Sequence, residues 1–359
     1  MSVSASPTSE TCAAQTLAGM TEEQRVGQLF VLGISGASLS TAEIGAISTY
    51  DLGSTFLDGN RKGGVTSVRT LSAAIQALAT TANTDGVHFF IAADQEGGYV
   101  QRLSGPGFDT IPTALDQGQL AATDLQAEAA TWGQQLAAAG INLNLAPVMD
   151  VVPPGQDSQN APIGALEREY GHDPATAGDH GAAVVRGMAA EGIATTLKHF
   201  PGLGRVTGNT DKVASVVDSV TTADDPYLAS FAEGIGAGAP FVMISLAIYS
   251  AIDPANQAVF SPTIIGTLLR GRLGFGGVVI SDDLGATAAV ASMAPGDRAT
   301  AFIAAGGDMV VVAGAVPAGQ MAAAVLARAA TDQGFAAQVE TAALRVLGAK
   351  AAYGLLSCG

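Results

Sequence analysis

Charged and polar side chains follow several apolar runs of this 359-residue chain, at points where buried strands are expected to end. They are Asp94, Asp150, Lys198, His199, Ser245 and Asp282. Carboxylates combined with a cation and an imidazole can carry out acid–base or nucleophilic chemistry. Whether they act together depends on the elements that position them.

The pair Lys198-His199 ends one apolar run and is followed by an unusual loop. Between 201 and 208 this loop contains one proline and three glycines, which disfavour regular structure. A charged strand end followed by such a loop is typical of a rigid scaffold presenting a functional site. A solvated surface turn is the alternative.

The rest of the sequence alternates short apolar runs with helical patterns. The predicted strands are 28–34, 52–57, 88–93, 141–149, 193–198, 240–245, 277–281 and 308–312. Continuously apolar strands are typical of parallel sheets that are buried on both faces. The alternation predicts an α/β fold, a (β/α)₈ TIM barrel in a single domain, with insertions after the third, fourth and fifth strands. A doubly wound sheet is the competitor, but no Gly-x-Gly-x-x-Gly follows the first strand.

The ends of the chain predict its domain boundaries. Residues 1–15 are expected to be an N-terminal flexible segment and 16–359 the barrel. No signal peptide is visible. The two cysteines, Cys12 and Cys358, lie near opposite ends of the chain, where a disulfide would form in an oxidising compartment; two free thiols in a cytosolic protein are the alternative. We therefore expect an extracellular or cell-envelope location, with the cytoplasm second.

Charge and hydropathy limit the partners. The chain has 16 Lys and Arg against 32 Asp and Glu, a net charge of −16. Such an acidic surface repels phosphate backbones, so we expect no nucleic-acid partner. The longest uncharged stretch, 309–327, is interrupted by glycine and proline, so we expect no integral membrane segment.

Four short motifs point to a known family. They are Asp94-Gln-Glu-Gly-Gly-Tyr-Val-Gln-Arg102, Lys198-His-Phe-Pro-Gly202, Ser281-Asp-Asp-Leu284 and Ala304-Ala-Gly-Gly-Asp-Met309. In this order, and at strand ends, they resemble glycoside hydrolase family 3, most closely its single-domain β-N-acetylglucosaminidase branch. The resemblance runs from about residue 21 to 354 and implies a barrel that cleaves glycosidic bonds.

The resemblance also assigns roles to residues. It implies that Asp282 is the catalytic nucleophile. Neighbouring strand residues point to opposite faces, so we expect Asp283 to stay out of the barrel mouth and to cap a helix. Asp94 with Arg102, and Lys198 with His199, match positions that bind sugar hydroxyls.

Two further assignments concern Arg168 and the metal content. Arg168 matches a substrate-binding arginine, but its segment, 163–171, is two residues longer than the family pattern, and a surface salt bridge is the alternative. No second histidine is spaced to complete a zinc site with His199, so we expect no metal. No cofactor is expected either, because two carboxylates suffice for the chemistry.

The loop departs from the family pattern. The family branch carries an Asp-x-His dyad whose histidine is the general acid/base, whereas this chain has Asn209-Thr210-Asp211 there. Either Asp211 is the general acid/base or the loop is inactive.

These observations predict a function. We expect a monomeric retaining β-N-acetylglucosaminidase that takes N-acetylglucosamine-containing oligosaccharides of cell-wall or chitin type. The alternatives are a broader β-glycosidase and an inactive saccharide-binding barrel.

Overall fold

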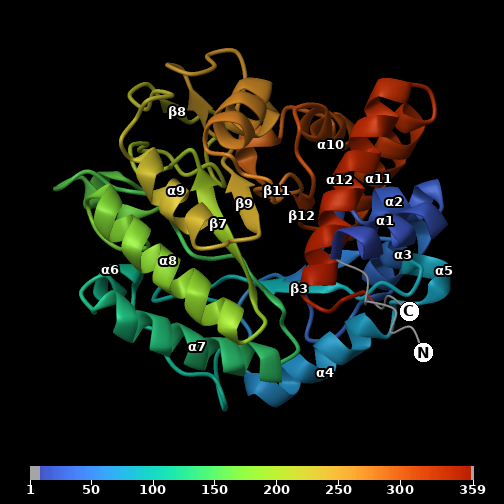
Figure 1. The fold of residues 1–359 in the computed structure, drawn as a ribbon, viewed down its shortest axis with the longest axis horizontal. Coiled ribbons are helices and arrows are strands. Elements are labelled where there is room, and N and C mark those ends of the chain that lie inside the picture. The colour runs from blue at the N-terminus through green and yellow to red at the C-terminus, as the bar shows by residue number, and fades with distance from the viewer. Residues whose placement is uncertain (1–8, 357–359) are drawn as a thin grey trace, which may run out of the picture.

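Eight parallel strands form one sheet that curls into a barrel with helices around it (Figure 1). The computed structural model describes residues 9–356. The strands, in sheet order, are β11 (Val278–Ser281), β9 (Phe241–Ile244), β7 (Ala194–Phe200), β6 (Leu143–Asn144), β3 (Phe90–Ala93), β2 (Ser54–Leu57), β1 (Phe30–Ile34) and β12 (Val310–Val312). A bridge between Ile280 and Met309 brings the two ends of the sheet together. The predicted (β/α)₈ barrel is therefore confirmed, and the doubly wound alternative was wrong.

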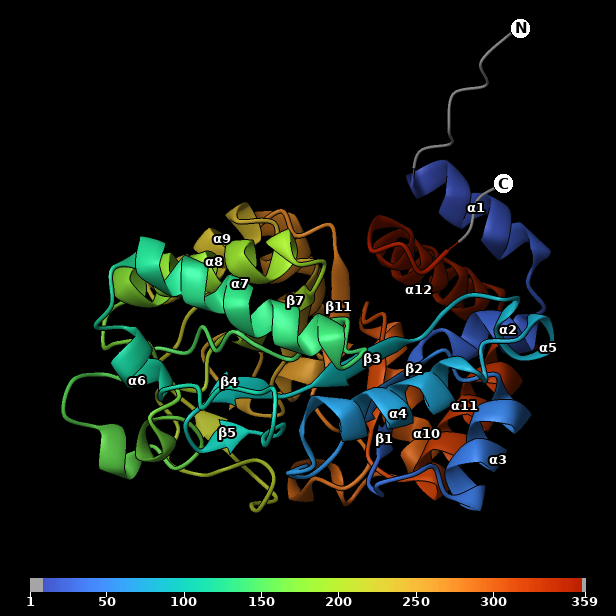
Figure 2. The same cartoon turned by 90° about the horizontal axis from the view of Figure 1, so that it is seen from below.

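Each strand is followed by a helix on the outside of the barrel. In chain order these are α3 (Thr41–Tyr50), α4 (Gly64–Gln76), α7 (Ala122–Ala138), α8 (Pro174–Ala190), α9 (Leu228–Gly236), η4 (Thr263–Arg272), α10 (Pro295–Ala304) and α11 (Ala315–Ala329). The last helix, α12 (Gln333–Ala352), packs against α1 (Ser9–Gly19), as Figure 2 shows. Two short helices, α5 (Thr81–Thr84) and α6 (Ala114–Gln117), lie in the connections, and α2 (Glu22–Gly27) precedes β1.

The helix starts follow from local sequence. Thr21 and Gln24 form a capping box at the start of α2: the Thr21 hydroxyl accepts from the Gln24 N–H at 3.2 Å, and the Gln24 side chain accepts from the Thr21 N–H at 3.1 Å. Asp173 caps α8 by accepting from the Thr176 N–H at 2.9 Å, with Pro174 as the first helical residue. These caps fix where the two helices begin.

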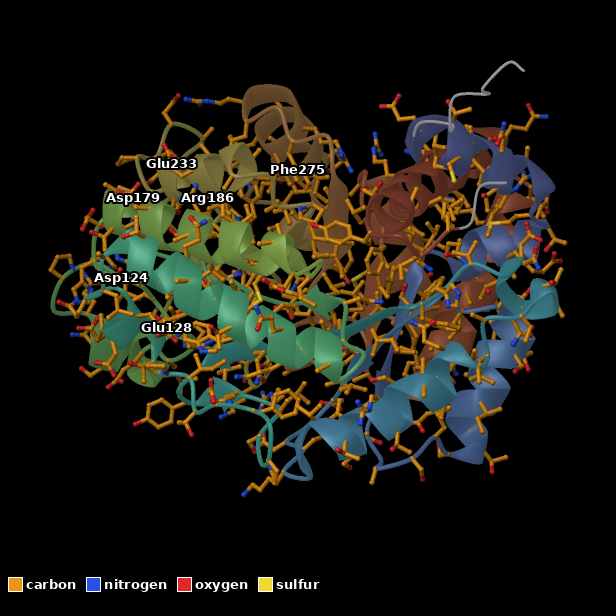
Figure 3. All side chains as sticks on the ribbon, turned by 60° about the horizontal axis from the view of Figure 1, so that its bottom comes forward. Asp124, Glu128, Asp179, Arg186, Glu233 and Phe275 are labelled. Atoms are coloured by element: carbon orange, nitrogen blue, oxygen red, sulfur yellow. The ribbon has the colours of Figure 1, made fainter. Side chains whose placement is uncertain are left out.

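Acidic side chains lie on the outer helical layer. Asp124 and Glu128 of α7, Asp179 of α8 and Glu233 of α9 are labelled in Figure 3, with Arg186 of α8 among them. Part of the chain's negative charge is therefore carried by helices on the outside of the barrel.

Two predicted boundaries were wrong. The fourth strand was expected over 141–149, but β6 ends at Asn144. Pro147 lies in the remainder, and since proline has no N–H it cannot donate to a strand ladder. Residues 9–15, expected in the flexible segment, form the first turns of α1, whose Ala13 and Leu17 join the core. Residues 1–8 lie outside the described part of the chain.

The N-terminal mouth of the barrel is closed. The rings of Phe90 and Phe241, from the non-adjacent strands β3 and β9, meet edge to face at 5.3 Å inside it. The fully buried Lys350 of α12 donates to Gln28 Oε1 at 2.6 Å and to Gly53 O at 2.7 Å, just before β1 and β2. Burial lowers the pKa of Lys350 to about 7. These side chains fill the N-terminal end of the barrel interior.

Cys12 is buried on α1 and is disulfide-bonded. Cys358, its predicted partner, lies outside the described residues. None of the helices within residues 9–356 has the length and hydropathy of a membrane-spanning segment.

Candidate active site

A cavity of about 200 Å³ lies at the C-terminal ends of the strands, where TIM barrels place their active sites. The strand-end candidates Asp150 and Ser245 do not line it, but every residue assigned to catalysis or substrate binding does. These are Asp94, Arg102, Arg168, Lys198, His199, Asp211 and Asp282. The barrel thus brings together side chains that are up to 188 positions apart (282 − 94).

The floor of the cavity is an ion-pair network centred on Lys198. This buried ammonium lies 2.6 Å from Asp94 Oδ1 and 2.6 Å from Glu96 Oε1. Burial alone would lower the pKa of Lys198, but Asp94 and Glu96 outweigh it and raise the pKa. Lys198 is therefore charged, and it fixes the orientation of Asp94, which is 24% exposed and so accessible to a ligand.

Glu96 is the network residue that the sequence-based assignment missed. It lies on β4 (Gln95–Gly97), which pairs with β5 (Val100–Gln101) as a hairpin beyond β3. Burial alone would raise the pKa of Glu96, but the charges of Arg168 and Lys198 hold it well below the usual range. Glu96 lies two residues after Asp94, and alternate residues of an extended segment share a face. This spacing was a signal in the sequence that Glu96 lies on the same side as Asp94.

Arg168 joins the same network from the segment between β6 and α8. Its Nε and Nη2 donate to the two oxygens of Glu96, both at 2.8 Å, and Nη1 donates to Pro162 O at 2.8 Å. This bidentate pair is largely buried, so the alternative of a surface salt bridge was wrong. Arg102 donates to Asn60 Oδ1 at 3.1 Å from the other side of the cavity.

His199 is held by a carboxylate behind it. Its Nδ1 lies 2.7 Å from Oδ2 of the fully buried Asp150, which also accepts from the Leu203 N–H at 2.7 Å. Asp150 therefore orients the imidazole and also anchors the start of the Gly-rich loop. The peptide bond between Lys198 and His199 is cis, and both side chains line the cavity.

Asp282 and Asp283, which follow β11, differ in their hydrogen bonds. Both border the cavity, so the expectation that only one would reach it was wrong. The Asp283 carboxylate accepts from three backbone N–H groups, those of Gly285, Ala286 and Ala313, at 2.7–2.9 Å. It therefore holds the turn after β11, and the expectation that it caps a helix was wrong. Asp282 accepts from the Asp283 N–H at 2.8 Å.

The environment of Asp282 suits a reactive carboxylate. Burial raises its pKa; His199 opposes the rise, and Asp211 adds to it. His199, Asp211 and Asp282 line the same cavity. A half-buried carboxylate that shares a cavity with an imidazole and a second carboxylate has the groups that nucleophilic attack with acid–base assistance requires.

The loop that carries Asp211 is docked beside Asp282. Backbone oxygens of Thr210 and Asp211 accept from the N–H groups of Ala289 and Ala288 at 3.1 and 3.2 Å. The Asn209 side chain accepts from the Asp211 N–H at 2.8 Å and so holds the backbone of the turn. The side chain of Asp211 is exposed and borders the cavity.

Potential metal ligands lie elsewhere. Within residues 9–356, the three side chains placed to share a metal ion are Asp157, Glu169 and His172, and none of them lines the cavity.

Comparisons with known proteins agree with this architecture. A family model described as the glycosyl hydrolase family 3 N-terminal domain matches residues 21–349. A Stenotrophomonas maltophilia protein named beta-hexosaminidase is 35% identical over 295 residues, 79% of this chain and 83% of the relative.

Solved structures are similar over nearly the whole chain. A β-N-acetylhexosaminidase from Beutenbergia cavernae matches with a TM-score of 0.91 and 52% identity, covering 92% of this chain and 98% of the other. A family 3 β-N-acetylglucosaminidase from a Paenibacillus species matches with a TM-score of 0.82 and 28% identity, covering 95% and 64%. The chain belongs to glycoside hydrolase family 3, and the resemblance seen in its motifs is confirmed.

Proposed function

We propose that the protein is a retaining β-N-acetylhexosaminidase that removes terminal N-acetylglucosamine from the non-reducing end of small cell-wall or chitin-type saccharides. The observation that carries the proposal is the pairing of Asp282, half-buried at the end of β11, with Asp211 on the docked loop, across one cavity. Retaining glycosidases use a pair of carboxyl groups that flank the bond to be cleaved.

The size and charge of the cavity support a single neutral sugar ring as its occupant. Its volume of about 200 Å³ is below the roughly 300–1,000 Å³ of pockets for drug-sized ligands. The carboxylates of Asp94 and Glu96 balance the cations of Lys198 and Arg168. This part of the wall offers hydrogen-bonding groups without net charge, which suits sugar hydroxyls and an exo mode of action.

The reaction follows from these positions. In the first step an Asp282 oxygen bonds to the anomeric carbon, while the bond to the leaving oxygen breaks and Asp211 gives that oxygen its proton. In the second step water attacks the same carbon, Asp211 takes the water's proton, and Asp282 leaves. His199, held by Asp150, favours the ionised form of Asp282 that both steps require.

One specific observation favours a second candidate. The loop carries Asn209-Thr210-Asp211 and no histidine, so an inactive barrel that still binds the sugar through Asp94 and Lys198 is the alternative. A broader β-glycosidase would use the same groups on a different sugar.

Assays with nitrophenyl glycosides separate these three functions. We expect hydrolysis of the β-N-acetylglucosaminide with a kcat/KM at least about tenfold above that of the β-glucoside, since one group filling a pocket is worth about 10–200-fold. NMR spectra recorded early in the reaction should show the β-anomer of the released sugar. Equal rates would point to the broader glycosidase, and sugar binding without turnover to the inactive barrel.

The location that we propose is the extracellular space or the cell envelope, which the disulfide-bonded state of Cys12 supports. The chain has two cysteines, so we expect the intact mass to show no alkylation until the protein is reduced, and two alkyl groups afterwards. Alkylation of both thiols without reduction would contradict the disulfide and favour the cytoplasm.

A further inference from the structure

A second group of chemically competent side chains lies on the segment between β6 and α8, outside the saccharide cavity. Asp157, at the start of η1 (Asp157–Gln159), Glu169 and His172 each offer one ligand atom, and these atoms lie within 4.8 Å of one another. His172 Nδ1 is 3.5 Å from Asp157 Oδ1 and 3.2 Å from Val152 O. The sequence expectation of no metal considered His199 and did not address this group.

Glu169 distinguishes the cluster from an ordinary acidic patch. The residue is fully buried, and neither of its carboxylate oxygens has a hydrogen-bond partner. Oδ1 of Asp157, also buried, accepts no hydrogen bond, and the His172 ring nitrogen lies 3.5 Å from it. Buried polar atoms are nearly always hydrogen-bonded, and a buried carboxylate facing a second one is costly unless a cation or a proton lies between them.

We propose that Asp157, Glu169 and His172 bind one divalent transition-metal ion, with zinc as the best match. Zinc accepts imidazole nitrogen together with carboxylate oxygen, and three protein ligands leave a fourth position for water. Calcium and magnesium prefer shells made of oxygen alone, so the imidazole disfavours them. The partly exposed side chains of Asp157 and His172, at 38% and 34%, give an ion access from solvent.

The position of the cluster assigns the metal a structural role. Glu169 directly follows Arg168, the partner of Glu96 in the cavity network. Asn160, three residues after Asp157, donates to Leu203 O and Val206 O of the Gly-rich loop at 2.7 and 2.8 Å. A metal ion would therefore cross-link the two ends of the segment that positions Arg168 and braces the loop.

A proton is the rival occupant. Burial, with Asp157 adding to it, raises the pKa of Glu169 to about 7, so the two carboxyl groups could instead share a proton. Replacing Glu169 with Gln distinguishes the two occupants. The Gln amide can donate the hydrogen bond that a shared proton would make, so that contact is kept, whereas a metal ion would lose a carboxylate ligand.

The experiment uses the full chain, stripped of metal with a chelator and titrated with zinc by calorimetry and by thermal unfolding. We expect the wild type to bind one more equivalent of zinc than Glu169→Gln. Zinc bound at this site should also raise the Tm of the wild type. Removing a residue that hydrogen-bonds to a metal ligand weakens metal binding by about 10–100-fold. Removing the ligand itself should weaken zinc binding by more than that. Glu167→Gln, the same change two residues away, is the matched control and should bind like the wild type.

The number of zinc equivalents bound distinguishes this site from zinc in the saccharide cavity. Glu169 does not line that cavity, so Glu169→Gln should leave zinc binding there unchanged. Should Glu169→Gln fail to fold without metal, His172→Gln and Asp157→Asn provide the same comparison at partly exposed positions. Equal stoichiometry in the wild type and the ligand variants, or no zinc uptake by the wild type, would overturn the proposal and leave the shared proton as the occupant.

Discussion

Replacing Asp282 with Asn is expected to abolish turnover, by a factor on the order of 10⁵–10⁶, the scale seen when a covalent nucleophile is removed. Asn keeps the shape of the side chain and the oxygen that accepts from the Asp283 N–H, but it cannot attack the anomeric carbon. Sugar affinity should change little, because Asp94 and Lys198 are untouched. Calorimetry with N-acetylglucosamine and a steady-state assay measure the two quantities separately.

Asp283→Asn is the matched control, one residue away with the same chemical change. Its carboxylate accepts from three backbone N–H groups. An amide nitrogen in place of one oxygen leaves an N–H group without an acceptor, which should reduce stability by about 1–3 kcal/mol and keep kcat within about tenfold. If Asp283→Asn abolished turnover and Asp282→Asn did not, the two roles would be exchanged.

Replacing Asp211 with Ala is expected to slow the enzyme according to the leaving group. With a poor leaving group the loss should be about 10²–10⁴-fold, the usual contribution of a general acid. With dinitrophenol, which needs no proton, release should be nearly unaffected, and azide should rescue the second step. The basic limb of the pH profile should also disappear, because it reports the deprotonation of the acid.

Asp211 is exposed, so its removal should change stability by less than about 0.5 kcal/mol. Lys212→Ala, at the adjacent exposed position, controls for disturbance of the loop. It should retain the wild-type rates, the basic limb of the pH profile and the wild-type stability. A variant Asp211→Ala that hydrolyses both substrates at the wild-type rate would show that another group is the acid/base. A carboxylate at this position also repels phosphate, which favours water as the acceptor.

The features that the sequence predicted well are those set by strand ends. Asp94, Lys198 and Asp282 each end a continuous apolar run, and parallel strands bring such ends together at one mouth of a barrel. Neither the barrel nor its site depends on where each helix begins. Errors of a few residues, such as the short β6, therefore left the predicted site intact.

The features that the sequence did not predict depend on pairings without periodicity. Glu96 meets Arg168 across 72 positions, through a hairpin and an irregular segment whose geometry no local pattern specifies. Asp150 was seen as a strand-end carboxylate, but nothing in the sequence showed that it would face His199 rather than the sugar. The cluster of Asp157, Glu169 and His172 arises in the same irregular segment.

The most direct test of the central claim is covalent trapping of the glycosyl-enzyme with a slow fluorinated N-acetylglucosaminide, followed by peptide mass mapping. We predict one sugar per chain, attached to Asp282, with loss of the label as activity returns in substrate-free buffer. A label on Asp283 or Asp94, or inactivation without any covalent sugar on a chain that hydrolyses the parent glycoside, would contradict the retaining mechanism assigned to Asp282.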